Sequence, residues 1–361
     1  MPGNFASLGY VGWVRFAGMP AGQTSWVRAF SADIKATQTS DRPDVVDGKT
    51  DKTVYQLKPI EVGGGVSFPA IHELTAGASD PPAKLMWKLA LQRNAELDGG
   101  GLVNPEGGDL GQFNTEVKYT SGVGFKYVGC IVNSYEFSIA KEENLTINLD
   151  IFGINRTTLD QSVIIQSPPY ALRNTRVVGW NDVRVLARHP SGNYEVSSGQ
   201  FRNFSAKVSN NTNRYYTLNG RLFPAAVLPT KRDINGSFTL MGRNSSLANY
   251  VYSATGNTPL GVTINNGNQL RCTEPGEIWF GYSLASYAAQ GQYDSNCSGQ
   301  FFVKLPGCLF EIEELKITND LFETTVNWHS LPGIEYMPNN EGRNTTFIWD
   351  SNWPVAWPPT W

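Results

Sequence analysis

The chain is poor in charge and has no long apolar run. Charged residues make up 17% of its 361 residues, with 29 basic and 32 acidic side chains. A net charge of −3 supplies no basic field that would hold nucleic acid tightly. No stretch of 18 apolar residues is present, so we expect no membrane-spanning helix. The first residues lack a charged start followed by an apolar core, so we expect no secretory signal.

Histidine is scarce, and the common catalytic motifs are missing. His72, His189 and His329 each lie far along the chain from another histidine or a cysteine, which argues against a metal or general-base site. The patterns Gly-x-Ser-x-Gly and Gly-x-x-x-x-Gly-Lys-Ser/Thr do not occur. The glycine run 63–65 leads into Val-Ser-Phe rather than a helix, which favours a strand bulge over a phosphate loop. We therefore expect a protein that is not an enzyme and binds no cofactor or metal.

Only four cysteines are present. Cys130 and Cys308 each enter a predicted strand, and we interpret them as small buried residues. Cys272 and Cys297 share one stretch rich in Gly, Ser and Asn. The sequence leaves open whether these two pair, although a reducing cytoplasm would keep them as thiols.

One sequence pattern occurs twice. Residues 28–34, Arg-Ala-Phe-Ser-Ala-Asp-Ile, return about half a chain length later as 202–208, Arg-Asn-Phe-Ser-Ala-Lys-Val. Two further matches follow in the same order, 61–64 with 233–236 and 126–130 with 304–308. An internal repeat of this kind predicts two tandem copies of one small domain.

Each copy has the pattern of a β domain. Opening strands are predicted at 11–16 and 182–186, and the repeated Phe-Ser-Ala stretch gives a second strand in each copy. Long loops are then predicted at 36–52 and 210–229. The next strand contains Gly64 in one copy and Gly236 in the other, which indicates a bulge or a close backbone approach.

Hairpins and one helix complete the prediction. Apolar residues alternate with polar ones on both sides of the turn 141–144, and again around 318–320, as expected for half-buried antiparallel hairpins. Pro81 and Pro82 open a helical pattern over 83–96. A shorter helix around 245–252 would be its counterpart.

The domain boundaries follow from composition. We predict a first domain at 1–165, a proline-rich linker at 166–178, a second domain at 179–335 and an extended tail at 336–361. Prolines in the tail forbid a helix. Its four tryptophans would be an aggregation liability if free, so we expect them to dock on this subunit or a neighbour. They are Trp349, Trp353, Trp357 and Trp361.

The order of strand, strand, long loop, strand, helix and terminal hairpin resembles the tail-tube fold of long-tailed bacteriophages and type VI secretion tubes. The segments that carry the resemblance are 129–139, 145–153 and 229–240. It implies a mainly β fold, with two tandem tail-tube-like antiparallel β-sandwich or barrel domains, each with a short flanking helix. Most such proteins carry one domain and form hexameric rings, so a fused pair implies a trimeric ring with pseudo-sixfold symmetry.

The resemblance also implies a function. The chain would be a structural virion protein, made in the host cytoplasm, whose stacked rings form a tail tube that ejects genomic DNA. Its partners would be copies of itself, DNA in transit and other tail proteins such as baseplate, terminator, sheath or tape-measure proteins. The ring-stacking loop would contain Asp41, Asp44, Asp47 and Asp51, whose spacing of three and four does not suit an EF-hand calcium loop.

Two alternatives remain open at this point. One is a related structural protein, namely a tail terminator, a baseplate-proximal tube protein or a secretion-system tube protein. The other, from a different class, is a carbohydrate-binding virion module that uses the tryptophan-rich tail.

Overall fold

The computed structural model is mainly β, with antiparallel pairing throughout the described strands. It describes residues 12–17, 26–41, 56–73, 82–91, 111–119, 123–160, 175–188, 195–196, 201–218, 221–242, 262–265, 269–272, 276–283, 300–318, 321–330 and 347–349.

The described residues of the first half form nine strands and helix α1 (Pro82–Leu91). The strands are β1 (Trp13–Ala17), β2 (Val27–Arg28), β3 (Ser31–Asp41), β4 (Gln56–Pro69), β5 (Ile71–Glu73), β6 (Phe113–Lys118), β7 (Gly124–Ala140), β8 (Thr146–Gly153) and β9 (Asn155–Thr158).

The second half contributes the remaining strands. They are β10 (Thr175–Val177), β11 (Val183–Arg188), β12 (Glu195–Val196), β13 (Phe201–Ser209), β14 (Asn213–Tyr215), β15 (Ala226–Leu228), β16 (Asp233–Gly242), β17 (Val262–Asn265), β18 (Gln269–Cys272), β19 (Gly276–Ser283), β20 (Gln300–Thr318), β21 (Leu321–Ser330) and β22 (Phe347–Trp349).

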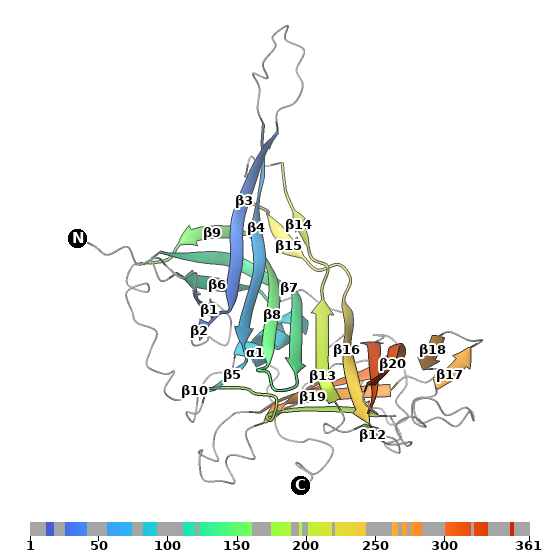
Figure 1. The fold of residues 1–361 in the computed structure, drawn as a ribbon. Coiled ribbons are helices and arrows are strands. Elements are labelled where there is room, and N and C mark those ends of the chain that lie inside the picture. Colours follow the sequence, from blue (N-terminus) through green and yellow to red (C-terminus); the bar gives the residue numbers. More distant parts are fainter. Residues whose placement is uncertain are drawn as a thin grey trace.

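Eight strands form one continuous layer, which we call the main sheet. Its order is β3-β4-β8-β7-β13-β16-β21-β20. Figure 1 shows the first six of these strands side by side. The first four come from one half of the chain and the last four from the other, in corresponding order.

A second layer covers the main sheet in each half. The first cover sheet is β2-β1-β6-β7-β9, and the second is β12-β11-β19-β20-β22. Strands β7 and β20 belong to both layers because their first parts pair in the cover sheet and their second parts in the main sheet. Each half is thus a β-sandwich that shares one long strand between its layers.

Alternating side chains explain the two layers. Along β8, Ile147, Leu149 and Ile151 are buried, and the residues between them are partly exposed. The cover sheet packs on this apolar face, where Phe16 lies 5.9 Å from Phe68, ring centroid to ring centroid. A single hydrophobic cluster runs through both halves.

Several sequence predictions are confirmed. The two hairpins are β7–β8 and β20–β21, and the opening strands correspond to β1 and β11. Helix α1 begins at Pro82, and its face of Leu85, Met86 and Leu89 is buried. Residues 92–96 and the second predicted helix lie outside the described residues.

The predicted loop 36–52 is wrong at its start. Strand β3 continues to Asp41, where it pairs with Gln56 of β4. Residues 37–40 of this extension are polar and exposed, so they show no alternation of apolar side chains, although threonine favours strands. The predicted loop 210–229 likewise contains β14 and β15. The last residues of the predicted linker, 175–177, form β10, which pairs with β5.

Candidate assembly surfaces

Strand pairing joins the two halves of the main sheet. Strand β7 lies antiparallel to β13, from Ser134 opposite Ser209 to Ala140 opposite Asn203. Within this run Glu136 lies opposite Lys207. A cross-strand pair of opposite charge stabilises antiparallel strands. The chain therefore contains a strand interface between its own two halves, which we call the junction.

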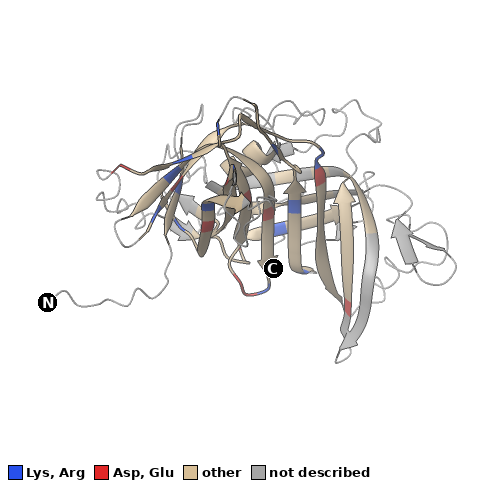
Figure 2. Ribbon diagram, turned by 90° about the horizontal axis from the view of Figure 1, so that it is seen from above, with Lys and Arg blue, Asp and Glu red and all other residues tan. Residues whose placement is uncertain are grey.

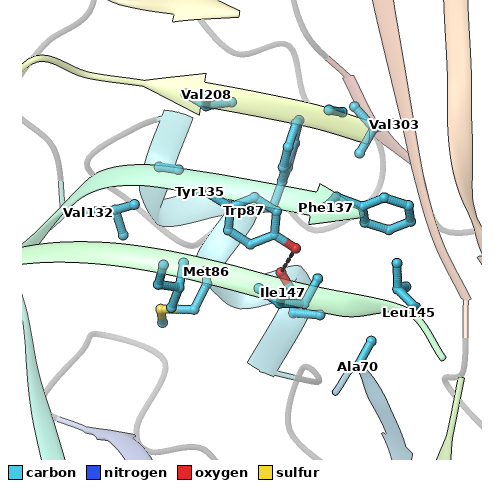
Figure 3. Packing of buried hydrophobic residues seen from close by; sticks show 14 of the residues in the cluster. Ala70, Met86, Trp87, Val132, Tyr135, Phe137, Leu145, Ile147, Val208 and Val303 are labelled. Atoms are coloured by element: carbon cyan, nitrogen blue, oxygen red, sulfur yellow. Dashed lines mark hydrogen bonds between the residues drawn. The ribbon is translucent and has the colours of Figure 1, made fainter. Parts of the chain in front are cut away.

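Aromatic side chains from both halves pack against the junction. Trp87 of α1 meets Tyr135 of β7 edge to face, with ring centroids 5.0 Å apart, and the Tyr135 hydroxyl donates to the Ala83 carbonyl at 3.1 Å (Figure 3). Phe280 of β19 lies 5.3 Å from Trp87 and 4.8 Å from Phe137. The helix of one half and the cover sheet of the other thus share one aromatic cluster.

Asn210 fixes the end of the junction. Its side chain is completely buried, and Nδ2 donates to the carbonyl oxygens of Ala90 and Val132 at 2.8 and 2.9 Å. Its Oδ1 accepts a hydrogen bond from Nε of Arg232 at 3.1 Å. Burial lowers the pKa of Arg232 to about 10. The asparagine therefore links α1, β7 and a partly buried cation.

The two halves correspond residue by residue in the main sheet. Reading across the strands from the predicted glycine equivalence, two rows of partners match. They are Ile34–Gly64–Ile151–Val132 and Ala206–Gly236–Trp328–Phe310. A side chain at Gly64 would meet the Asp33 carbonyl oxygen, and one at Gly236 would meet that of Ser205, which confirms the close approach predicted at these glycines.

These rows correct the alignment of the repeat. The sequence match equates Phe30 with Phe204 and Ile34 with Val208, yet Phe30 is 55% exposed and Phe204 is buried. In the structure Ile34 corresponds to Ala206, which precedes Val208 on the same face of β13. We align the two halves on Gly64 and Gly236 because both glycines make the same close backbone contact, which a side chain would block. The short Phe-Ser-Ala match can arise by chance.

The crossing between layers is the same in both halves. Gly129 and Gly307 have φ of 63° and 66°, and each precedes a buried cysteine. Sγ of Cys130 donates to the Tyr127 carbonyl at 3.4 Å, and Sγ of Cys308 lies in the same relation to Leu305 at 3.2 Å. Burial raises the pKa of Cys130 to about 11. Both thiols are buried residues, as the sequence predicted.

The face of the main sheet that points away from the core is polar. Hydroxyl and amide groups bridge its strands, for example Ser67 to Asn148 at 2.7 Å and Ser205 to Ser237 at 3.2 Å. Figure 2 shows charged positions of both signs scattered over the strands. Among the side chains that the structure describes, alternation places six carboxylates and two lysines, Lys35 and Lys207, on this face. Arg202 and Arg214 reach the same face through ion pairs with Glu323 and Glu61, so the six carboxylates outnumber these four cations. The carboxylates are Asp33, Glu61, Glu136, Asp150, Asp233 and Glu323.

A loop of the second half lies on this face of the first half. Arg214 of β14 donates to the Val62 carbonyl at 3.0 Å, and its guanidinium carbon lies 3.8 Å from the ring centroid of Phe152. The Tyr216 hydroxyl donates to the Ile60 carbonyl at 3.1 Å. Sequence reasoning missed these contacts because they join segments that lie far apart along the chain.

The main sheet ends in two strand edges. In the part of the chain that the structure describes, β3 pairs with β4 alone. Beyond Glu311, where it meets Arg271 of β18, β20 pairs with β21 alone among the described strands. Unpaired edges present backbone donors and acceptors to another chain. The edge strand β3 corresponds to β13, and the edge strand β20 corresponds to β7. These are the two strands that meet at the junction.

The predicted assembly residues are only partly described. Asp41 ends β3, whereas Asp44, Asp47 and Asp51 lie outside the described residues. Trp349 ends β22, which pairs with β20 where β9 pairs with β7. Trp353, Trp357 and Trp361 lie outside the described residues, as does Cys297.

Within the described ranges, no cluster of three or more His, Cys, Asp or Glu side chains is arranged to hold a metal ion. The described part also holds no helix that is long and apolar enough to cross a membrane.

Comparison with protein families gives a match over most of the chain. A family model described as phage tail tube protein matches residues 20–293, about three quarters of the chain. A comparison with curated proteins gives no match. The family match spans the first half from β2 onward, the junction and the second half as far as β19.

Proposed function

Because the chain belongs to the phage tail tube protein family, we propose that three copies close a ring with pseudo-sixfold symmetry, and that stacked rings form the tube. The chain is a structural tail protein of the virion, and its family membership argues against an enzyme. Its synthesis in the host cytoplasm is part of the proposal.

The observation that carries the trimeric ring is the repetition inside the main sheet. Each half supplies four strands in corresponding order, and the junction joins the last strand of one half to the first strand of the other. The outer edges, β20 and β3, repeat this combination. Joining β20 of one copy to β3 of the next would extend the sheet, and closure of a ring would leave no edge free.

The polar face suits the inner wall of a tube that conducts DNA. Its described charges are mostly carboxylates, and its hydroxyl and amide groups are hydrogen-bonded between strands. Carboxylates repel phosphate, so a wall of this composition would let genomic DNA pass without holding it. The proposed partners are therefore copies of the chain, DNA in transit and other tail proteins.

Two further parts of the proposal concern contacts between rings and subunits. The segment that begins at Asp41 and contains Asp44, Asp47 and Asp51 follows the projecting strand β3 and would contact the adjacent ring. The tail would dock on its own subunit or a neighbour. Pairing of β22 with β20 supports docking that starts on its own subunit.

Electron microscopy of the purified protein tests the ring. We expect tubes or rings with threefold symmetry and six similar lobes, and native mass spectrometry of single rings should give three chains. Rings of six chains, or a monodisperse monomer at high concentration, would overturn the proposal. Filaments would favour the main tube protein, and discrete rings that never stack would favour a terminator.

A further inference from the structure

The two edge strands of the main sheet, β3 and β20, determine the register in which neighbouring copies can pair. Lys35 and Asp33 lie on β3 with side chains 65% and 80% exposed, and in the isolated chain they pair with each other at 3.5 Å. On the other edge, residues 314–318 of β20 pair with β21 alone among the described strands. Both edges can therefore accept another strand.

The junction supplies a template for that contact. Across it, Glu136 of β7 lies opposite Lys207 of β13, and Ser138 lies opposite Ser205. Side chains pack over this interface and fix its register. We expect the same register wherever a strand equivalent to β7 pairs with a strand equivalent to β13.

The internal repeat transfers the template to the outer edges. Strand β3 corresponds to β13 through two equivalent pairings, of Ile34 with Gly64 and of Ala206 with Gly236. Ile34 is thus equivalent to Ala206. The next position along each strand equates Lys35 with Lys207, and the preceding position equates Asp33 with Ser205.

Strands β7 and β20 correspond in the same way. Cys130 is equivalent to Cys308 at the crossing between layers, and each strand then contains one bulge, after Val132 in β7 and two positions further along, after Ile312, in β20. Beyond the bulge, Glu136 pairs with Asn148 of β8. The residue of β21 equivalent to Asn148 is Thr325, which pairs with Glu314. Glu136 is therefore equivalent to Glu314, and continuing along both strands makes Ser138 equivalent to Lys316.

We infer that β20 of one copy pairs antiparallel with β3 of the next in a register that places Glu314 opposite Lys35 and Lys316 opposite Asp33. This inference rests on the proposed ring. The transferred register follows from backbone pairing alone, and it brings together two pairs of opposite charge. The partner of each edge is thus a second copy of this chain.

Charge also argues against the nearest competing register. The alignment taken from the sequence match equates Asp33 with Lys207, and it would put Glu314 opposite Asp33. Like charges directly opposite each other destabilise strand pairs. A shift by a single position would exchange the core face of β3 for its polar face, which the buried Ile34 forbids.

Charge reversal tests the pairing in full-length protein. Lys35→Glu places two carboxylates together, and Glu314→Lys places two amines together. We expect each single variant to raise the concentration needed for assembly by about fivefold or more, because the contact recurs at every subunit interface. The double variant should return to within about twofold of the wild type.

Cysteine pairs test the register itself. With Lys35→Cys and Glu314→Cys in one chain, oxidation should join neighbouring copies and give dimers and trimers on a non-reducing gel, since opposite positions lie within disulfide range. Asp33→Cys with Glu314→Cys represents the competing register and should cross-link far less. Each single variant, which retains the native cysteines, controls for their contribution.

The outcomes separate the inference from the ring. If wild-type rings form but the Asp33 and Glu314 cysteine pair cross-links better, or Lys35→Glu assembles normally, the register is wrong and the ring stands. If wild-type protein forms no ring, the proposed function fails. The melting temperature of the unassembled Lys35→Glu variant should match that of the wild type, because Lys35 is exposed.

Discussion

The guanidinium carbon of Arg214 lies 3.8 Å from the ring centroid of Phe152, so a loop of the second half is anchored on the first half. The same guanidinium pairs with Glu61 at 3.5 Å, but that carboxylate is 65% exposed and water screens the pair. The ring contact and the hydrogen bond to the Val62 carbonyl should therefore supply most of the stabilisation.

Replacing Arg214 should loosen this anchor. We expect Arg214→Ala to lower the free energy of unfolding by about 1–3 kcal/mol, through loss of the cation–π contact and one charged hydrogen bond. Arg214→Lys should recover only part, since lysine lacks the planar fork. Urea denaturation of unassembled protein measures both. As a control, Arg202→Ala removes an exposed ion pair with Glu323 and should cost less than about 1 kcal/mol.

Replacing two adjacent glycines on β4 by alanine should change the free energy of unfolding by very different amounts. Gly64 has φ of 145°, and a side chain there would meet the Asp33 carbonyl, so Gly64→Ala should cost about 3 kcal/mol or more, or prevent folding. The nearest atom to a side chain at Gly65 is the Leu149 carbonyl oxygen at 3.8 Å, so Gly65→Ala should change stability by less than about 1 kcal/mol. Soluble yield and melting temperature of the two variants measure these effects. Equal effects would contradict the close contact between Gly64 and the Asp33 carbonyl.

Loss of the buried amide at Asn210 should weaken the junction. Asn210→Ala leaves the Ala90 and Val132 carbonyls and the Arg232 guanidinium without this partner, and we expect a loss of about 2–4 kcal/mol. Asn211→Gly is a matched control. It keeps the left-handed backbone, where φ is 47°, and removes only exposed hydrogen bonds, so the loss should stay below about 1 kcal/mol. Similar losses in both variants would refute the role of Asn210.

Stability should fall in alkaline solution, in part through Cys130. Burial raises the pKa of this thiol from 9.0 to about 11, so the folded state favours the protonated form. This contribution is fully present below pH 9 and is lost as the pH rises towards 11, by roughly 2–3 kcal/mol in total. Cys130→Ala lacks this titration. The difference in melting temperature between wild type and variant should therefore shrink between about pH 8 and pH 10.5, and a constant difference would contradict the pKa.

Patterns of neighbouring residues correctly predicted one hairpin and the helix. The hairpin of β7 and β8 alternates apolar and polar side chains, and α1 combines an opening proline with an apolar face. Strand β3 was predicted too short because residues such as Thr37 and Ser40 extend it with polar side chains only. No alternation marks a strand whose two faces are both exposed to water.

Long-range pairing could not be predicted in the same way. The junction depends on which strands meet, and neither β7 nor β13 carries a local signal for the other. The duplicated glycines came closest, since Gly64 and Gly236 mark the same backbone contact. The match of Phe30 with Phe204 misplaced the register of β3 because it relied on identical residue types. The equivalent positions of the two halves are instead defined by which residues pair across the strands.

Strands β7 and β20 pass from the cover sheet into the main sheet without a break, over 17 and 19 residues. In a sandwich whose layers touch only through side chains, a sideways load can make one layer slip over the other. Here the load would travel along covalent backbone, twice in every chain. The crossings at Gly129 and Gly307 therefore connect the two layers covalently, and in the proposed tube they would resist sliding of one layer over the other when the tube bends.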